Sequence, residues 1–168
     1  MSDKKRRKAA GLAALVLFGI PVMCRYGPGL PALKGLILCA VLIWAGLRDL
    51  ETREVPDFIT VMIIILSFVG FEQRFLPSMI AGAAAVFIPQ TAAAVIRPGS
   101  VGGADIKISS SVAFLLGAER GIAAYCISLA AAVITMIAVK KIRKESASKP
   151  FALVPFLCFG SAVSLALL

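Results

Sequence analysis

The chain has 168 residues, of which 60% are hydrophobic and only 16% are charged, and its formal net charge is +9. This composition lies far outside the soluble globular range and excludes a soluble fold. We expect an all-α, polytopic membrane helix bundle, because helices satisfy their own backbone hydrogen bonds in lipid. Residues 1–168 are interpreted as a single integral-membrane domain, with a basic N-terminal segment (1–8) before the bundle (9–168).

Seven apolar runs follow one another along the chain, separated by glycine, proline or charged residues. They span residues 9–24, 31–48, 58–71, 76–96, 106–118, 121–139 and 151–168. A transmembrane helix needs roughly 17 to 25 residues in lipid and fewer where protein surrounds it. The sequence therefore predicts about seven transmembrane helices, or six if the short, serine-containing run 106–118 does not cross. The first run is expected to be a retained helix, because no small-residue cleavage site follows it.

The basic residues predict how these helices are oriented. If the N-terminus is cytoplasmic and every run crosses, most of the 18 lysines and arginines fall at cytoplasmic helix ends, as the positive-inside rule requires. Removing one crossing at 106–118 would move the basic cluster at 140–144 to the other side. The positive charge is thus explained by topology, so nucleic-acid binding is not expected, and anionic membrane lipids are the expected partners of this face.

Two aspartates stand at the ends of apolar runs. Asp49 follows the second run and Asp105 precedes the fifth, and ionisable groups at membrane depth are functional candidates by default. The orientation above places both at the cytoplasmic side. Two carboxyl groups at one depth can share a water molecule, which indicates general acid and base chemistry.

The segments around these aspartates favour a water-accessible site. Pro56 ends any helix that continues from the second run. Gly102 and Gly103 allow an unwound backbone, which membrane proteins tolerate only beside protein or water. Asp57 is expected to cap the helix that begins near Phe58. Each element also has a simpler interpretation, as a solvated helix end or an ordinary helix N-cap.

No residue pattern indicates a metal or another cofactor. The chain has no histidine, and its four cysteines are scattered through apolar runs without a CxxC spacing, so a zinc site is not expected. These cysteines are expected to be small buried thiols of the bundle. They are Cys24, Cys39, Cys126 and Cys158.

Together the two aspartate segments resemble the signatures of the prepilin peptidases, the type IV leader peptidase family of GxGD intramembrane aspartyl proteases. The first signature is matched by Asp49, Arg53, Val55, Pro56 and Asp57, and the second by Gly102, Asp105, Ile106 and Lys107. The segment 149–163 also resembles the closing segment of the family.

The resemblance implies an aspartic endopeptidase with Asp49 and Asp105 as its catalytic pair. It implies that the leader peptide of a pilin-like precursor is cleaved at the cytoplasmic membrane of a prokaryote. Its implied substrate-binding or site-shaping residues are Arg53, Pro56, Asp57, Gly102, Gly103 and Lys107.

Two residues and one segment depart from the family pattern. Ala104 stands where the second glycine is usual, and Asp57 where asparagine is usual. Alanine is a mild replacement unless the position needs a positive φ. The cysteine-rich insertion of the larger bacterial enzymes is missing from the sequence, which predicts a short form without methyltransferase activity.

Three other interpretations stay open. The same aspartates would serve a small proton- or cation-coupled transporter whose glycine-rich break is a discontinuous helix, although the sequence shows no inverted repeat. A presenilin-like protease is disfavoured, because Pro31-Ala32-Leu33 precedes the first aspartate here and follows it in those proteins. A structural subunit or degenerate peptidase would not need either aspartate.

Overall fold

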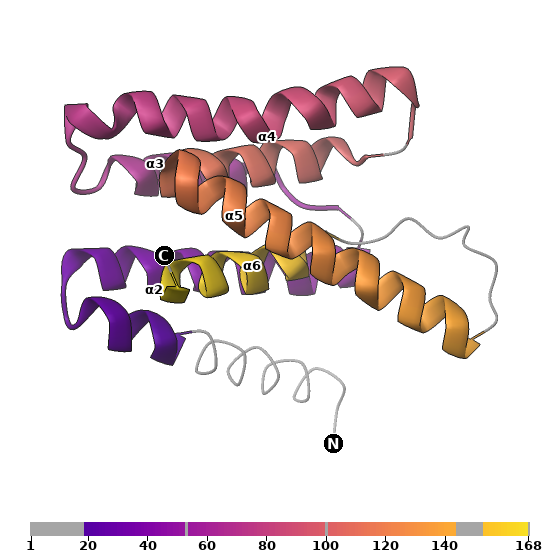
Figure 1. Cartoon of the computed structure of the whole chain (residues 1–168), viewed down its shortest axis with the longest axis horizontal. Coiled ribbons are helices and arrows are strands. Elements are labelled where there is room, and N and C mark those ends of the chain that lie inside the picture. Colours follow the sequence, from indigo (N-terminus) through magenta and orange to yellow (C-terminus); the bar gives the residue numbers. More distant parts are fainter. Residues whose placement is uncertain (1–18, 53, 100, 144–152, 168) are drawn as a thin grey trace.

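The computed structural model describes residues 19–52, 54–99, 101–143 and 153–167, and these ranges contain helices, turns and no strand. The helices are α2 (Leu30–Thr52), α3 (Phe58–Phe68), the 3-10 turn η1 (Gln73–Phe75), α4 (Leu76–Ile96), α5 (Gly103–Arg143) and α6 (Val154–Leu167). A further helical segment, residues 19–26, precedes α2. The prediction of an all-α fold is confirmed (Figure 1).

Three helices in the described ranges are long and apolar enough to cross a membrane. They lie within Leu30–Thr52, Gln73–Ile96 and Gly103–Val139, and the last of these ranges is divided into two helical halves at Gly117. α3 and α6 are also apolar but have only 11 and 14 residues, which is short of the roughly 20 residues that a hydrocarbon core of about 30 Å requires. The chain is thus a multi-pass membrane protein, while the count of seven crossings stays a prediction. Most of the first apolar run lies outside the described residues.

The long helix α5 is broken at Gly117, where φ is 80° and ψ is 178°. Gly121 then packs against Ala113, since a Cβ on Gly121 would lie 2.7 Å from the Cα of Ala113. Residues this far apart in a straight helix are separated by two turns, so the chain reverses at the break (Figure 1). The two runs predicted at 106–118 and 121–139 therefore form separate helical halves of α5.

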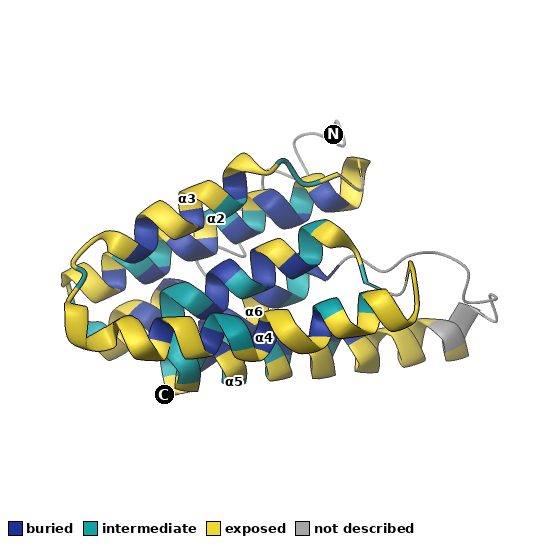
Figure 2. Cartoon of the chain, turned by 90° about the horizontal axis from the view of Figure 1, so that it is seen from above, coloured by how far each residue is buried: buried dark blue, intermediate teal, exposed yellow. Residues whose placement is uncertain are grey.

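The core lies between α2, α3, α5 and α6. Its fully buried members include Leu38, Leu42, Ile59, Ile108 and Leu157. α6 packs against both α2 and α5, while α4 packs mainly against α5. Figure 2 shows that the outward faces of the helices are largely exposed, and many large apolar side chains lie there. Such faces are those that a lipid bilayer covers.

The cysteines divide into two pairs. Cys39 and Cys158 are buried, and the thiol of Cys158 donates to the backbone oxygen of Cys39 at 3.8 Å. The side chains of Cys24 and Cys126 are exposed at the surface of the helix bundle. The expectation of buried thiols is therefore correct for the first pair and wrong for the second, because residues 24 and 126 face outward from their helices.

Candidate active site

Asp49 lies in the last turn of α2 and faces the protein interior. It follows Leu42 and Ala45 on the buried stripe of this helix, at the three- and four-residue spacing that aligns side chains on one face. Only 9% of Asp49 is exposed. The neighbouring Gly46 admits α6 closely, since a Cβ there would lie 3.2 Å from the Cα of Pro155. The interpretation of this segment as a solvated helix end is therefore wrong for Asp49.

Asp105 lies in the first turn of α5 and is half-buried. Its carboxyl group folds back over Gly102, where a Cβ would lie 3.0 Å from Oδ2 of Asp105. Gly103 opens the helix, and a Cβ there would meet nothing within 4 Å. Ala104 adopts helical geometry in this turn, a conformation that suits alanine. Gly102, rather than Gly103, is thus the glycine that makes room for the aspartate.

The fold brings these two aspartates together. Asp49 and Asp105 lie near enough for their charges to interact, although they come from the end of α2 and the start of α5. The half-buried Tyr125, on the second half of α5, also lies near Asp105. Sequence reasoning missed Tyr125, whose only signal is a polar hydroxyl inside an apolar run.

A second group of residues, which the sequence analysis did not predict, connects α4 to the start of α5 by hydrogen bonds. The buried amide Nε2 of Gln90 donates to Oγ of Ser109 at 2.7 Å and to the backbone oxygen of Val86 at 3.1 Å. The hydroxyl of Ser109 in turn donates to the backbone oxygen of Asp105 at 2.6 Å. Polar residues inside apolar runs were the signal, because buried amides and hydroxyls require partners.

Lys107 reaches from α5 to the segment before α3. Its Nζ lies 2.9 Å from Oδ1 of Asp57. Asp57 makes no side-chain hydrogen bond to the start of α3, so the prediction that it caps this helix is wrong. The carboxylate instead pairs with the ammonium group of Lys107.

The turn between α2 and α3 has the shape that the proline predicts. Residues 54–56 are not helical, and the oxygen of Pro56 accepts a hydrogen bond from the N–H of Ile59 at 3.2 Å. Thr52 closes the end of α2 by donating to the oxygen of Arg48 at 3.1 Å. Arg53, a predicted site residue, lies outside the described residues.

In the described part of the chain, no group of three or more cysteines and acids is placed to hold a metal ion.

Residues 36–139 match the model of the type IV leader peptidase family. The chain belongs to this family. The matched range contains both aspartates, Asp57 and Lys107, and it also contains Gln90. Neither the fold nor this match supports the alternative of an ion-coupled transporter.

One curated relative from this group of peptidases was found in Bacillus subtilis (strain 168). It is a prepilin leader peptidase/N-methyltransferase, 26% identical over 161 residues. The match covers 93% of this chain and 64% of the relative, so the chain spans less than two thirds of the relative's length. No solved structure gives a significant match.

Proposed function

We propose that this family member is a membrane-embedded aspartic endopeptidase and that Asp49 and Asp105 are its catalytic pair. The observation that carries the proposal is the placement of these two carboxyl groups, from the end of α2 and the start of α5, near enough for their charges to interact. A pair of this kind is what hydrolysis by general acid and base requires. The family match to residues 36–139 supports peptidase chemistry at the same place.

In the proposed reaction the two carboxyl groups share one proton. Neighbouring carboxyl groups resist double ionisation, so one is charged while the other keeps its proton. The charged group takes a proton from a water molecule as the water oxygen bonds to the peptide carbonyl carbon. The protonated group donates a hydrogen bond to the carbonyl oxygen. Breakage of the C–N bond is completed when a proton passes to the leaving amine.

The proposed substrate is a pilin-like precursor with a short basic leader before an apolar helix. With a cytoplasmic N-terminus and about seven crossings, the aspartates lie at the cytoplasmic face of a prokaryotic inner membrane. The scissile bond of a precursor held in the bilayer reaches this depth while its leader stays in the cytoplasm. The relative's printed name supports this class of substrate; methyl transfer, which that name also includes, is not proposed for this chain.

Leader recognition in this proposal depends on acidic side chains near Asp49. Glu51, Glu54 and Asp57 follow it in sequence. Asp57 is already neutralised by Lys107, while Glu54 is exposed. Glu51 is exposed as well, so Glu51 and Glu54 are the acids that we expect to attract a basic leader, and Glu54→Lys should reduce cleavage of basic leaders more than cleavage of neutral leaders. An equal reduction for both kinds of leader would contradict this role.

The experiment that tests the function is cleavage of pilin-like precursors co-expressed with the wild type, Asp49→Asn or Asp105→Asn. Asparagine keeps the shape of the side chain but cannot exchange the proton. N-terminal sequencing of the product should show cutting at the leader boundary by the wild type alone, with all three proteins present in the membrane at equal amounts. Continued cutting by either variant would disprove the two-aspartate mechanism.

A further inference from the structure

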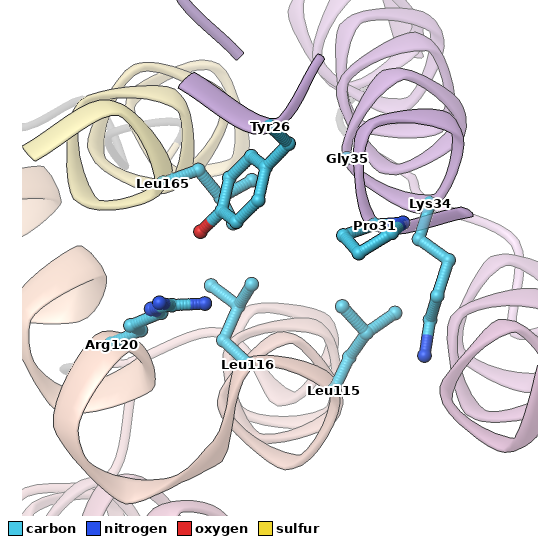
Figure 3. A pocket seen from close by; sticks show the side chains of 8 residues that line it. All are labelled: Tyr26, Pro31, Lys34, Gly35, Leu115, Leu116, Arg120 and Leu165. Carbon is cyan, nitrogen blue, oxygen red and sulfur yellow. The ribbon is translucent and has the colours of Figure 1, made fainter. Parts of the chain in front are cut away.

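A small cavity lies at the end of the bundle opposite to the aspartates. Its volume is about 130 Å³, and it is lined by the helical segment 19–26, α2, α5 and α6 (Figure 3). Lys34, which lines it, precedes Asp49 on α2 by about 22 Å, given a rise of about 1.5 Å per residue. The cavity and the aspartate pair are therefore separated by most of the thickness of a hydrocarbon core of about 30 Å.

Two polar groups of this cavity have unused hydrogen-bonding capacity. The hydroxyl of Tyr26 is buried and has no hydrogen-bond partner among the described residues. The ammonium group of Lys34 donates to the backbone oxygen of Ser67 at 3.4 Å, which is longer than a typical hydrogen bond. No carboxylate of the described ranges lies within ion-pair distance of Lys34. An oxygen-rich ligand would satisfy both groups.

Arg120 adds a second positive charge to the cavity. Its guanidinium carbon lies 5.6 Å from the centre of the Tyr26 ring, and its backbone oxygen accepts a hydrogen bond from Ser164 at 2.8 Å. Figure 3 shows the guanidinium and the Tyr26 hydroxyl on one side of the cavity and Lys34 on the other. No acidic side chain lines the cavity, so its field favours an anion.

The volume of the cavity and its apolar walls limit the class of ligand that it can bind. Sites for drug-sized molecules have volumes of roughly 300 to 1,000 Å³, so this cavity has room for one charged group rather than a whole molecule of that size. Its apolar walls are formed by Leu115, Leu116 and Leu165. A charged group attached to hydrocarbon matches such a lining.

We propose that this cavity binds the phosphate group of an anionic membrane lipid. Lys34, Arg120 and the Tyr26 hydroxyl donate to the phosphate oxygens, and the acyl chains lie along the apolar surface outside. Basic pockets between transmembrane helices on the cytoplasmic or matrix side bind lipid headgroups, and this cavity has the same kind of lining at the other end of the bundle. The site is distinct from the cytoplasmic basic residues, because it lies at the opposite end of α2.

The proposal is tested by native mass spectrometry of the full-length chain in detergent with phosphatidylglycerol or phosphatidylcholine added. The wild type should retain phosphatidylglycerol in preference to phosphatidylcholine. Lys34→Met should bind phosphatidylglycerol about tenfold more weakly, because a charge-assisted hydrogen bond is lost. Tyr26→Phe keeps the ring beside Arg120 and should weaken binding about threefold through loss of one neutral hydrogen bond.

Arg74→Met is the matched control, since it removes the same charge at the same end of the bundle. Arg74 lies outside the cavity and pairs with Glu72 at 2.6 Å, so this variant should bind phosphatidylglycerol like the wild type. Wild-type binding by both Lys34→Met and Tyr26→Phe would overturn the proposal.

Inorganic phosphate distinguishes a lipid from a free anion as the source of the phosphate group. The melting temperature is measured with phosphatidylglycerol or with inorganic phosphate at matched ionic strength. Stabilisation by the lipid alone supports the proposed site. Stabilisation by inorganic phosphate without selective phosphatidylglycerol binding would show that a lipid is not the ligand.

Discussion

Lys107 and Asp57 are 50 positions apart in sequence and form an ion pair of 2.9 Å. Lys107 is two residues beyond Asp105 on α5, and Asp57 directly precedes α3. The pair therefore links the segment that follows Asp49 to the helix that contains Asp105. Its side chains are 55% and 75% exposed, so we expect its main effect on the spacing of these segments rather than on stability, since exposed pairs contribute about 0.2 to 1 kcal/mol.

Reversing one charge of this pair should lower cleavage, and exchanging both should restore part of it. Asp57→Lys places two cations side by side and separates α3 from α5, whereas Asp57→Lys combined with Lys107→Asp re-forms the pair. We expect the single change to reduce the cleavage rate by up to about fivefold, because exposed charge pairs contribute about 0.2 to 1 kcal/mol and a tenfold change in rate needs about 1.4 kcal/mol. Cleavage of a precursor in membranes measures both variants, and an exchange no more active than the single change would contradict this role.

Gln90→Leu should reduce cleavage by loosening the contact between α4 and the first turns of α5. The change removes the 2.7 Å hydrogen bond to Ser109, whose hydroxyl contacts the backbone of Asp105. Loss of a buried hydrogen bond costs about 1 to 3 kcal/mol. Because the position of Asp105 is altered, we expect kcat to fall more than KM changes.

Ser110→Ala is the matched control for Gln90→Leu. The Ser110 hydroxyl donates to the backbone oxygen of Ile106 at 2.7 Å within α5, without reaching α4. This variant should keep near-wild-type kcat. If Gln90→Leu lowers only the amount of folded protein and leaves kcat unchanged, the contact is structural rather than positioning.

Gly102→Ala should lower cleavage while leaving the fold intact. The added Cβ would lie 3.0 Å from Oδ2 of Asp105, so the carboxyl group must rotate away from its position beside Asp49. The neighbouring Val101→Ala removes side-chain atoms without adding any near Asp105, and we expect it to cleave normally. Circular dichroism would establish that both variants are folded. Normal cleavage by Gly102→Ala would show that cleavage does not depend on the close contact between residue 102 and the Asp105 carboxyl group.

Gly117→Ala should destabilise the bundle. With φ at 80°, an alanine at this position is strained, and its Cβ would also lie 3.0 Å from the hydroxyl of Ser78. That hydroxyl accepts a hydrogen bond from the N–H of Ala118 at 3.0 Å, so the start of the second half of α5 would lose its cap. We expect the free energy of unfolding to fall by about 1 to 3 kcal/mol, measured as a lower melting temperature in detergent.

Gly29→Ala provides the comparison for Gly117→Ala. Gly29 has no positive φ, and a Cβ there would make two ordinary contacts, at 3.5 Å with Pro31 and at 3.8 Å with the backbone oxygen of Tyr26. Its substitution should change the melting temperature little. A similar decrease for both variants would show that the positive φ at Gly117 is not the cause.

Several features of the fold follow from local sequence. Apolar runs predict helices because lipid cannot hydrogen-bond to an open backbone. Pro56 predicts the end of α2, because it lacks an N–H donor. The boundary between the runs 106–118 and 121–139 predicted the break at Gly117 to within a few residues.

The partners of polar side chains required the tertiary structure. The family signatures single out Asp57 and Lys107 separately, yet their ion pair depends on how α3 packs against α5. The same holds for the contact of Gln90 with Ser109.

By itself, the sequence determined the membrane class, the helical runs and the two aspartates that stand at their ends. The tertiary structure decided that those aspartates are neighbours, that Asp57 pairs with Lys107, and that Tyr26 and Lys34 border one cavity. The physical reason is the distance along the sequence over which each kind of interaction acts. Hydrophobic periodicity depends on neighbours within a few turns, whereas these contacts arise where buried apolar faces bring distant helices together.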